Sequence, residues 1–216
     1  MGTSSRLLLV PTDGERRVVE RVIGSDVPGR LRIELCGFGP IAAAARTARL
    51  LVDLEPASVT LVGIAGAIDD RLAIGRAYRF DQVACYGVGV GTGNDFQQAS
   101  SLGWSQWPGD LSVGQRAVGD RIGRHGATAG HLMLTACAAS AGPADVAMRR
   151  RLVPDAVAED MEGFGVALAC ELAGVSWTII RGISNRAGDR DHARWRVEPA
   201  LEAAATLALQ TLAEAP

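Results

Sequence analysis

The stretch EDMEGFGVALACELAGVSWTIIRGISNRAGDRD, residues 159–191, carries the pattern that decides the fold of this chain. Apolar residues recur at helical spacing in its first half: Met161, Phe164, Leu168 and Leu172. Gly174 supplies a helix stop, and residues 175–183 then predict a mostly apolar strand that ends at Ser184-Asn185. Because open α/β sheets bind ligands beyond the carboxyl ends of their strands, the helix start and the strand end predict one common pocket.

Outside this stretch, strand and helix patterns alternate along the chain. Strands are expected at residues 6–11, 31–36, 58–62, 79–86 and 132–137, and helices at 15–23, 41–54 and 199–212. This alternation predicts an α/β fold in which helices flank a largely parallel sheet, built as a single domain of residues 1–216. Gly63-Ile64-Ala65-Gly66 is expected to end the third strand, and residues 87–114 form a glycine-rich loop without a period.

Composition excludes several classes of partner. With 22 basic and 24 acidic residues mixed along the chain, we expect no nucleic acid, and the three arginines at 149–151 predict a solvated helix face. The apolar run at residues 7–10 is too short to span a membrane, and no group of residues has metal-ligand spacing. Four dispersed cysteines predict reduced core thiols and a cytoplasmic enzyme: Cys36, Cys85, Cys137 and Cys170.

In combination, MEGFGVA at residues 161–167 and RGISNRAGDRD at 181–191 resemble the purine nucleosidase and nucleoside phosphorylase superfamily. Within it, they look most like the futalosine hydrolases of menaquinone biosynthesis, and the resemblance spans nearly the whole chain. It implies that Met161 packs beneath a ribose, that Glu162 binds the ribose hydroxyls and that Asn185 binds the purine. It also implies a small nucleoside substrate, no cofactor, and a homodimer or larger homo-oligomer.

Cleavage of a nucleoside produces a cation-like sugar and a departing purine anion, so an enzyme needs a base that positions water. In nucleosidases of this superfamily, a Glu shortly after the first strand has that role, which implies Glu15 here, with Asp13 as a nearby competitor. Ile64 stands where phosphorylases commonly carry a phosphate-binding serine, and no arginine in the second loop matches their phosphate clamp. Water, rather than phosphate, is therefore the expected nucleophile.

Asn185 bears on the identity of the base. Relatives that cleave adenine carry Asp at this position, which can protonate purine N7. An amide has no acidic proton, but its NH2 group can donate to N7 or to a carbonyl oxygen at C6. Asn185 therefore predicts a 6-oxopurine, hypoxanthine or guanine. The resemblance also implies that Ile64, Ala65 and Gly66 lie against the base, where glycine allows a close approach.

Two parts of the expected site lack a clear residue. Ala139 occupies the position where better-known nucleosidases carry an aromatic that stacks on the purine. Candidates for that stacking lie in the long loop: Phe96, Trp104 and Trp107. Futalosine carries a carboxyphenyl group, so a cation and an apolar slot should exist near the ribose 5′ end, but the sequence does not identify the cation.

The expected reaction is hydrolysis of futalosine to hypoxanthine and dehypoxanthine futalosine. Three alternatives stay open at this point: a 6-oxopurine nucleoside phosphorylase, a methylthioadenosine-type nucleosidase and a nucleoside-binding protein without activity. A phosphorylase would share Glu162 and Asn185 but would depend on phosphate. A binding protein would keep Met161 and Asn185, while Glu15 would have no role.

Overall fold

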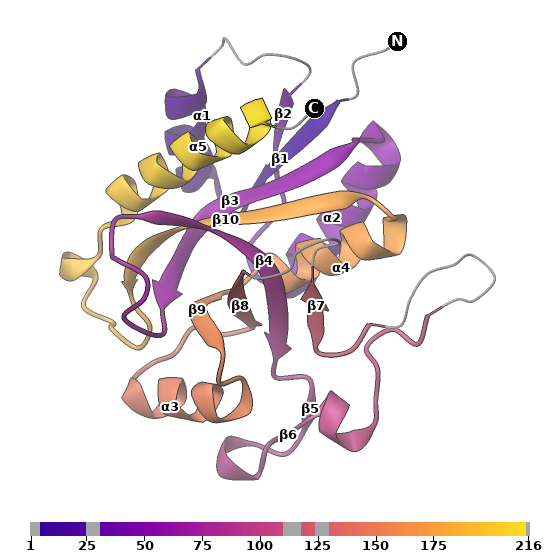
Figure 1. The fold of residues 1–216 in the computed structure, drawn as a ribbon, viewed down its shortest axis with the longest axis vertical. Coiled ribbons are helices and arrows are strands. Elements are labelled where there is room, and N and C mark those ends of the chain that lie inside the picture. Colours follow the sequence, from indigo (N-terminus) through magenta and orange to yellow (C-terminus); the bar gives the residue numbers. More distant parts are fainter. Residues whose placement is uncertain (1–4, 25–30, 110–117, 124–129, 215–216) are drawn as a thin grey trace.

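The computed structural model describes residues 5–24, 31–109, 118–123 and 130–214 (Figure 1). Its strands are β1 (Arg6–Val10), β2 (Leu31–Leu35), β3 (Ser58–Ala67), β4 (Ala77–Tyr86), β5 (Gly89–Val90), β6 (Gln97–Gln98), β7 (Arg121–Gly123), β8 (His131–Ala136), β9 (Ala156–Asp160) and β10 (Ser176–Arg186). Its α-helices are α1 (Asp13–Ile23), α2 (Pro40–Leu54), α3 (Pro143–Leu152), α4 (Gly163–Ala173) and α5 (Val197–Glu214). Short 3-10 helices are η1 (Gly93–Asp95), η2 (Ala99–Leu102) and η3 (His192–Arg194).

The main sheet is mixed and has the order β10-β4-β8-β9-β3-β1-β2, with β7 paired to β4. Strand β3 also pairs with β10, so β3, β10, β4, β8 and β9 form a closed circuit of paired strands. Five of the pairings are parallel and three are antiparallel. The predicted α/β fold with a largely parallel sheet is therefore confirmed.

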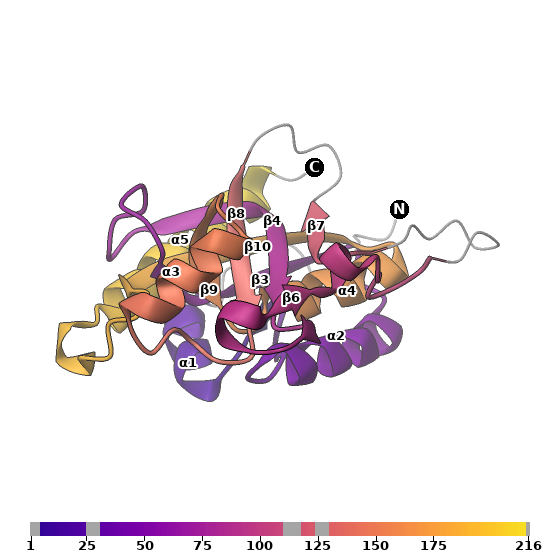
Figure 2. The ribbon, with the colours of Figure 1, turned by 90° about the horizontal axis from the view of Figure 1, so that it is seen from below.

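Two helix pairs cover the sheet. Helices α1 and α5 pack together over β1, β3 and β10, around buried Val19, Ile180 and Ala204. Helices α2 and α4 pack together elsewhere on the sheet, and Figure 2 shows them side by side. Their close approach requires glycine, because a Cβ added to Gly165 would lie 2.3 Å from the carbonyl oxygen of Pro40. None of the described helices is both long and apolar enough to cross a membrane.

The predicted end of the third strand at residues 63–66 is wrong, because β3 continues to Ala67 and pairs with β10 along its whole length. Glycine at position 63 serves packing inside the strand. A Cβ there would lie 2.1 Å from Nη1 of Arg181 on the neighbouring strand. Strand β10 likewise runs past its predicted end to Arg186, with a register shift between Ile183 and Asn185.

Other local predictions also need correction. Strand β9 was not predicted, and the glycine-rich loop contains β5, β6, η1 and η2, while residues 110–117 lie outside the described part. Of the three arginines on α3, Arg149 is buried in an ion pair, so only the other two fit a solvated face. Three cysteines are buried as predicted, but Cys137 is exposed, and all four are free thiols.

Candidate active site

A cavity of about 930 Å³ lies where the carboxyl end of β3 meets β9 and β10. This volume falls in the usual range for small-molecule sites. Eight of the nine sequence-predicted site residues line it: Glu15, Ile64, Ala65, Gly66, Ala139, Met161, Glu162 and Asn185. They come from five separate segments of the chain, so the fold brings together residues that are up to 170 positions apart (185 − 15).

Phe96, the ninth, does not line the cavity. It follows η1, and its ring packs against Tyr86 with the two centroids 5.3 Å apart. This contact holds the ring near the hairpin of β5 and β6, and neither Trp104 nor Trp107 lines the cavity. The aromatic side chains that do line it are Phe38 and Trp195, which were not predicted.

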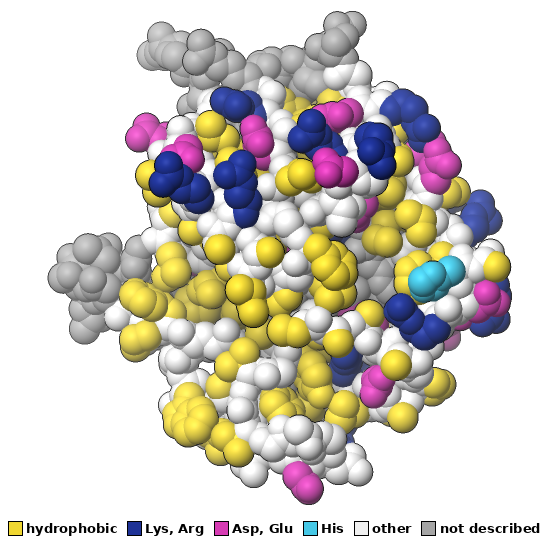
Figure 3. Space-filling model, turned by 180° about the vertical axis from the view of Figure 1, so that it is seen from behind, with side chains coloured by type: hydrophobic (Ala, Val, Ile, Leu, Met, Phe, Trp, Pro, Cys, Tyr) yellow, Lys and Arg dark blue, Asp and Glu magenta, His cyan; other side chains and the backbone are white. Residues whose placement is uncertain are grey.

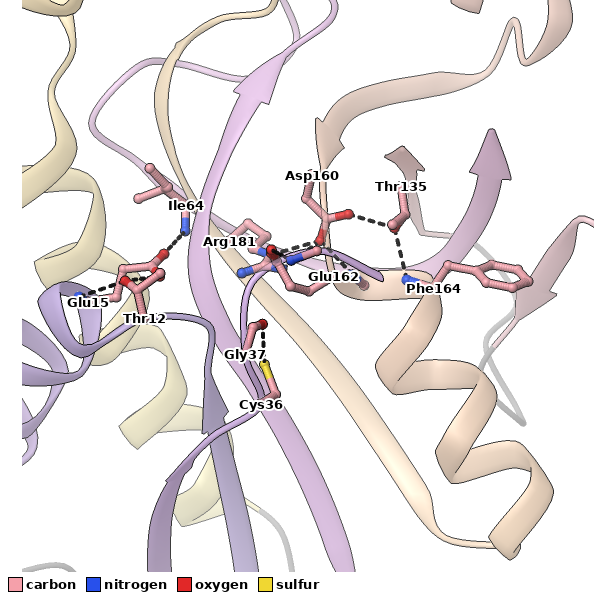
Figure 4. A network of polar contacts seen from close by, with 12 residues as sticks. Thr12, Glu15, Cys36, Gly37, Ile64, Thr135, Asp160, Glu162, Phe164 and Arg181 are labelled. Carbon is pink, nitrogen blue, oxygen red and sulfur yellow. Dashed lines mark hydrogen bonds and ion pairs between the residues drawn. The ribbon is translucent and has the colours of Figure 1, made fainter. Parts of the chain in front are cut away.

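Glu15 lies in the first turn of α1, where the helix dipole favours a carboxylate. The N-cap residue Thr12 accepts a hydrogen bond from the backbone N–H of Glu15 (3.3 Å) and donates its hydroxyl to Glu15 Oε2 (2.8 Å). The backbone N–H of Ile64 donates to Glu15 Oε1 at 3.2 Å, as Figure 4 shows. These bonds fix a buried carboxylate toward β3. Asp13, the competing acid, is exposed and does not line the cavity.

Arg181 on β10 is completely buried behind the cavity. Its guanidinium donates to Asp160 Oδ2 at 2.7 Å and to Glu162 Oε2 at 3.0 Å (Figure 4). Burial lowers the pKa of Arg181, but the charges of Asp160, Glu162 and Glu15 outweigh burial and raise it above its ordinary value. The guanidinium is thus a permanent positive charge among three acids. Its Nη1 has no hydrogen-bond partner among the described residues.

Asp160 also fixes the start of α4, together with Thr135 on β8. The backbone N–H of Gly163 donates to Asp160 Oδ2 at 2.9 Å, and that of Phe164 donates to Thr135 Oγ1 at 2.8 Å. The Thr135 hydroxyl in turn donates to Asp160 Oδ1 at 2.6 Å. Two of the N–H groups that a helix start leaves unpaired are thereby satisfied. The same bonds hold Glu162, the N-cap residue of α4, in place.

Glu162 combines burial with strong partners. The backbone N–H of Gly39 donates to its Oε1 at 3.0 Å, and Arg181 donates to its Oε2. Burial raises the pKa of Glu162 to about 7, although the positive charge of Arg181 opposes this. The negative charges of Asp160 and Glu15 contribute to the increase. Glu162 therefore changes its charge near neutral pH.

The side-chain amide of Asn185 is oriented by its two neighbours. The Ser184 hydroxyl donates to Asn185 Oδ1 at 2.7 Å, and Asn185 Nδ2 donates to the carbonyl oxygen of Arg186, also at 2.7 Å. An amide NH2 group carries two hydrogens, so one remains available to a ligand. Since Asn185 lines the cavity, that donor can serve a bound molecule.

Sequence reasoning missed a second buried ion pair at the cavity. Glu159 on β9 accepts hydrogen bonds from the backbone N–H and the hydroxyl of Ser140, at 2.9 and 2.7 Å. Arg149 on α3 donates to the same carboxylate and, at 2.7 Å, to the carbonyl oxygen of Ala138. Glu159 and Ser140 both line the cavity. The signal was present in the sequence, because Arg149 stands at helical spacing from Val146 and Val153.

The rim of the cavity carries a cation that was also missed. The guanidinium carbon of Arg190 lies 5.4 Å from the ring centroid of Trp195, and the ring of His192 lies 4.4 Å from the same ring. The acids next to Arg190 along the chain pair with Arg194 instead. Arg190 has no ion pair or hydrogen bond with the described residues. The described residues also contain no cluster of acids, histidines and cysteines that could hold a metal ion.

Comparisons with known proteins agree with this arrangement. Residues 10–215 match the phosphorylase superfamily. The futalosine hydrolase of Streptomyces coelicolor is 34% identical over 175 residues, which cover 77% of this chain and 72% of that protein.

Two solved structures share the fold. The first is the 5′-methylthioadenosine/S-adenosylhomocysteine nucleosidase of Colwellia psychrerythraea in complex with adenine. It has a TM-score of 0.77 at 20% identity and covers 98% of this chain and 95% of its own. The second, the futalosine hydrolase of Helicobacter pylori, has a TM-score of 0.74 at 15% identity and covers 98% of both chains. The predicted nucleoside phosphorylase-like fold is confirmed.

Proposed function

This chain belongs to the phosphorylase superfamily, and from that membership we propose that it hydrolyses the N-glycosidic bond of futalosine. The products are hypoxanthine and dehypoxanthine futalosine, and the reaction belongs to menaquinone biosynthesis. The observation that carries the proposal is the convergence of Glu15, Glu162 and Asn185 on one cavity. The similarity to the Streptomyces coelicolor futalosine hydrolase supports this choice of substrate.

In the proposed reaction, Glu15 is the general base for water. Its two carboxylate oxygens are fixed by Thr12 and the Ile64 N–H, and each keeps acceptor capacity for a further bond. Water attacks the sugar carbon C1′ and gives a proton to Glu15, while the electron pair of the C1′–N9 bond leaves with the purine. The purine anion then takes up a proton from solvent to give hypoxanthine, and Glu15 returns its proton to solvent. No step requires a metal or a cofactor.

Glu162 holds the sugar through the ribose hydroxyls, over the apolar side chain of Met161. Because the Gly39 N–H binds Oε1 of Glu162 and Arg181 binds Oε2, each oxygen keeps a lone pair that is available to the hydroxyl groups. This interaction strengthens as positive charge builds on the sugar, so it stabilises the transition state more than the bound substrate.

Asn185 stabilises the leaving purine without protonating it. The free hydrogen of its Nδ2 donates to N7 or to the C6 oxygen, where negative charge develops as the C1′–N9 bond breaks. An amine at C6, as in adenine, would meet this donor with a second donor. The amide therefore favours hypoxanthine over adenine and counts against a methylthioadenosine-type activity.

Arg190 is our candidate for binding the carboxylate of the futalosine tail. Among the described residues it has no ion pair, it lies over Trp195, and apolar residues of the same cavity supply a slot: Val18, Phe38, Val197 and Leu201. Glu198, an acid on this side of the cavity, is paired with Arg21 at 2.6 Å. A guanidinium stacked on an aromatic ring suits a planar carboxyphenyl group.

Arg190→Gln should raise the KM for futalosine by roughly tenfold, because a charge-assisted hydrogen bond is lost. The KM for inosine, which has no carboxylate, should not change. Steady-state kinetics on both nucleosides measures the contrast. An equal increase in the KM for both substrates would show that Arg190 does not bind the carboxylate of the futalosine tail.

We also propose that the enzyme is a cytoplasmic homodimer or larger homo-oligomer. Figure 3 shows hydrophobic side chains across the middle of the face seen from behind. Large apolar side chains at the start of α2 and along it are exposed: Phe38 at 65%, Ile41 at 80% and Val52 at 72%. Phe38 also lines the cavity, so a partner subunit would border the site. Light scattering should give at least twice the mass of one chain, and a monomer would refute this part.

Incubation of the purified protein with futalosine and inosine, with and without phosphate, tests the proposed function. We expect phosphate-independent release of hypoxanthine from futalosine, unaffected by a chelator. Strict dependence on phosphate, with a sugar phosphate as product, would establish a phosphorylase. Binding of the nucleoside without release of its base would establish a binding protein.

A further inference from the structure

Glu159 and Asn185 flank the same residue in the sheet. Gly66 on β3 is paired with Glu159 on β9 and with Asn185 on β10. Side chains of paired residues project to the same face of a sheet, and neighbouring strands lie about 4.8 Å apart. The Cα atoms of Glu159 and Asn185 are therefore on the order of 10 Å apart. A Cβ on Gly66 would lie 3.3 Å from backbone atoms of Ala187, so glycine lets β3 pack closely against the chain that follows Asn185, and all three residues line the cavity.

The Glu159 carboxylate is built firmly into the wall of the cavity. Its side chain is 5% exposed, and the Ser140 N–H binds its Oε1, while the Ser140 hydroxyl and Arg149 bind its Oε2. A carboxylate has about four lone-pair sites, and three are occupied here. One site remains, on Oε1. Ser140 and Arg149 thus hold the Glu159 carboxylate in place as a hydrogen-bond acceptor. The positive charge of Arg149 balances the negative charge of this carboxylate.

A 6-oxopurine has hydrogen-bonding groups that match this arrangement. Hypoxanthine and guanine carry an N–H donor at N1, and acceptors at the C6 oxygen and N7. Adenine has the reverse pattern, with an acceptor at N1 and an amine at C6. A carboxylate acceptor on β9 and an amide donor on β10 complement the first pattern and oppose the second.

We propose that Glu159 accepts the N1–H of a 6-oxopurine base while Asn185 donates to its other edge. The inference rests on the proposed function for the identity of the site, and it adds a residue that determines which base is bound. Arg149 and Ser140 are positioning residues, because they act on the base through Glu159. As the base gains negative charge in the transition state, its N1–H becomes a poorer donor. Glu159 therefore contributes to affinity and selectivity more than to kcat.

Glu159→Gln tests the inference because it replaces a hydrogen-bond acceptor in the cavity wall, a carboxylate oxygen, with a donor, an amide NH2 group. The Ser140 hydroxyl and Arg149 both donate to Oε2, so the glutamine oxygen should remain there and its NH2 group should take the Oε1 position. That NH2 group opposes N1–H of hypoxanthine but suits N1 of adenine. Calorimetry should show hypoxanthine affinity reduced by tenfold to several hundredfold, with adenine affinity unchanged or improved.

Glu171→Gln is the matched control, because Glu171 accepts a hydrogen bond from Trp177 at 2.9 Å and does not line the cavity. It should leave both affinities unchanged. An unchanged ratio of hypoxanthine to adenine affinity in Glu159→Gln, including an equal loss of both, would overturn the proposal. This result would not affect the hydrolase assignment, which depends on the release of hypoxanthine from futalosine by the wild-type protein.

A measurement on the wild-type protein covers the case in which Glu159→Gln does not fold. Hypoxanthine labelled with ¹⁵N at N1 reports its own N1 proton by nuclear magnetic resonance. In the complex we expect this proton to be protected from exchange and shifted downfield, as for a donor to a carboxylate. An N1 proton that exchanges rapidly, at the frequency of the free base, would overturn the proposal.

Discussion

Two buried arginine–carboxylate pairs lie against the cavity, and they differ in what surrounds them. Arg181 is completely buried and pairs with Asp160 and Glu162, whereas Arg149 pairs with Glu159 at the cavity wall. Glu159 and Asp160 are consecutive on β9, so their side chains project to opposite faces of the strand. One short strand thereby supplies an acid to each pair.

The difference between the pairs follows from what each acid can still reach. Asp160 uses its oxygens on Arg181, on Thr135 and on the start of α4, which leaves its role structural. Glu159 lines the cavity and keeps one lone-pair site on Oε1. Asp160 therefore fixes the geometry of the site, whereas Glu159 and Glu162 keep lone pairs with which they can also bind a ligand. Breaking each pair should therefore have different consequences.

Removal of the buried cation is the largest expected effect. Arg181→Met leaves Asp160 and Glu162 buried without a counter-charge, which typically destabilises a protein by about 3–5 kcal/mol. Arg149→Met should destabilise less, by about 1–3 kcal/mol, because Glu159 keeps both bonds from Ser140. Urea denaturation of the two variants measures the contrast. If Arg149→Met were the less stable variant, the distinction between the pairs would fail.

Glu15→Gln tests the part of the site that performs the chemistry. Loss of the general base should reduce kcat by about a hundredfold or more, with a much smaller change in substrate binding. Asp13→Asn is the control, since Asp13 is exposed at the start of the same helix. It should retain nearly full activity. The reverse ranking in steady-state kinetics would transfer the role of base to Asp13.

The pH dependence should report Glu162, which belongs to the enclosed pair. Burial raises its pKa to about 7, so the carboxylate that binds the ribose hydroxyls is lost as the pH falls through that value. We expect kcat/KM to decrease by up to about tenfold per pH unit below 7, since this profile reports the free enzyme. Glu162→Gln should lack this inflection. A flat wild-type profile between about pH 6 and pH 8 would contradict the assignment.

The raised pKa of Glu162 affects stability and activity in opposite directions as the pH changes. Because the folded-state pKa of Glu162 lies above its ordinary value of 4.5, the native state favours the protonated acid. Its contribution to stability is complete below pH 4.5 and is lost as the pH rises through about 7. Binding of the ribose hydroxyls therefore requires the ionised form of Glu162, whereas folding favours the protonated form.

The sequence was sufficient for the residues that lie in its distinctive motif. The resemblance to the superfamily indicated Met161, Glu162 and Asn185, the pattern of helix start and strand end predicted a common pocket, and all three residues line one cavity. The motif also contained Arg181 and Asp160, but their role depends on the pairing of β10 with β3 and of β9 with β8. Strand pairing over such distances along the chain is not visible in local patterns.

The remaining errors have a similar origin. Arg149 was taken as solvated because its neighbours are also arginines, although only its own position faces the sheet. Phe96 was a reasonable stacking candidate on composition, but Tyr86 fixes its ring outside the cavity. The third strand was predicted to end at Gly63, but this glycine makes room for Arg181, a residue 118 positions away (181 − 63).

The exchange of Asn185 for Asp tests the account of the site most directly. The carboxylate would face the C6 oxygen of hypoxanthine, and about 1–3 kcal/mol for an unpaired polar atom corresponds to a loss of roughly fivefold to 150-fold. Asp can protonate N7 and accept from an amine, so relative activity toward an adenine-bearing analogue should improve. The ratio of kcat/KM for hypoxanthine- and adenine-bearing substrates, measured on both proteins, cancels general damage to the fold. We predict that this ratio moves toward adenine in Asn185→Asp, and an unchanged ratio would contradict the assignment of Asn185 as a reader of the base.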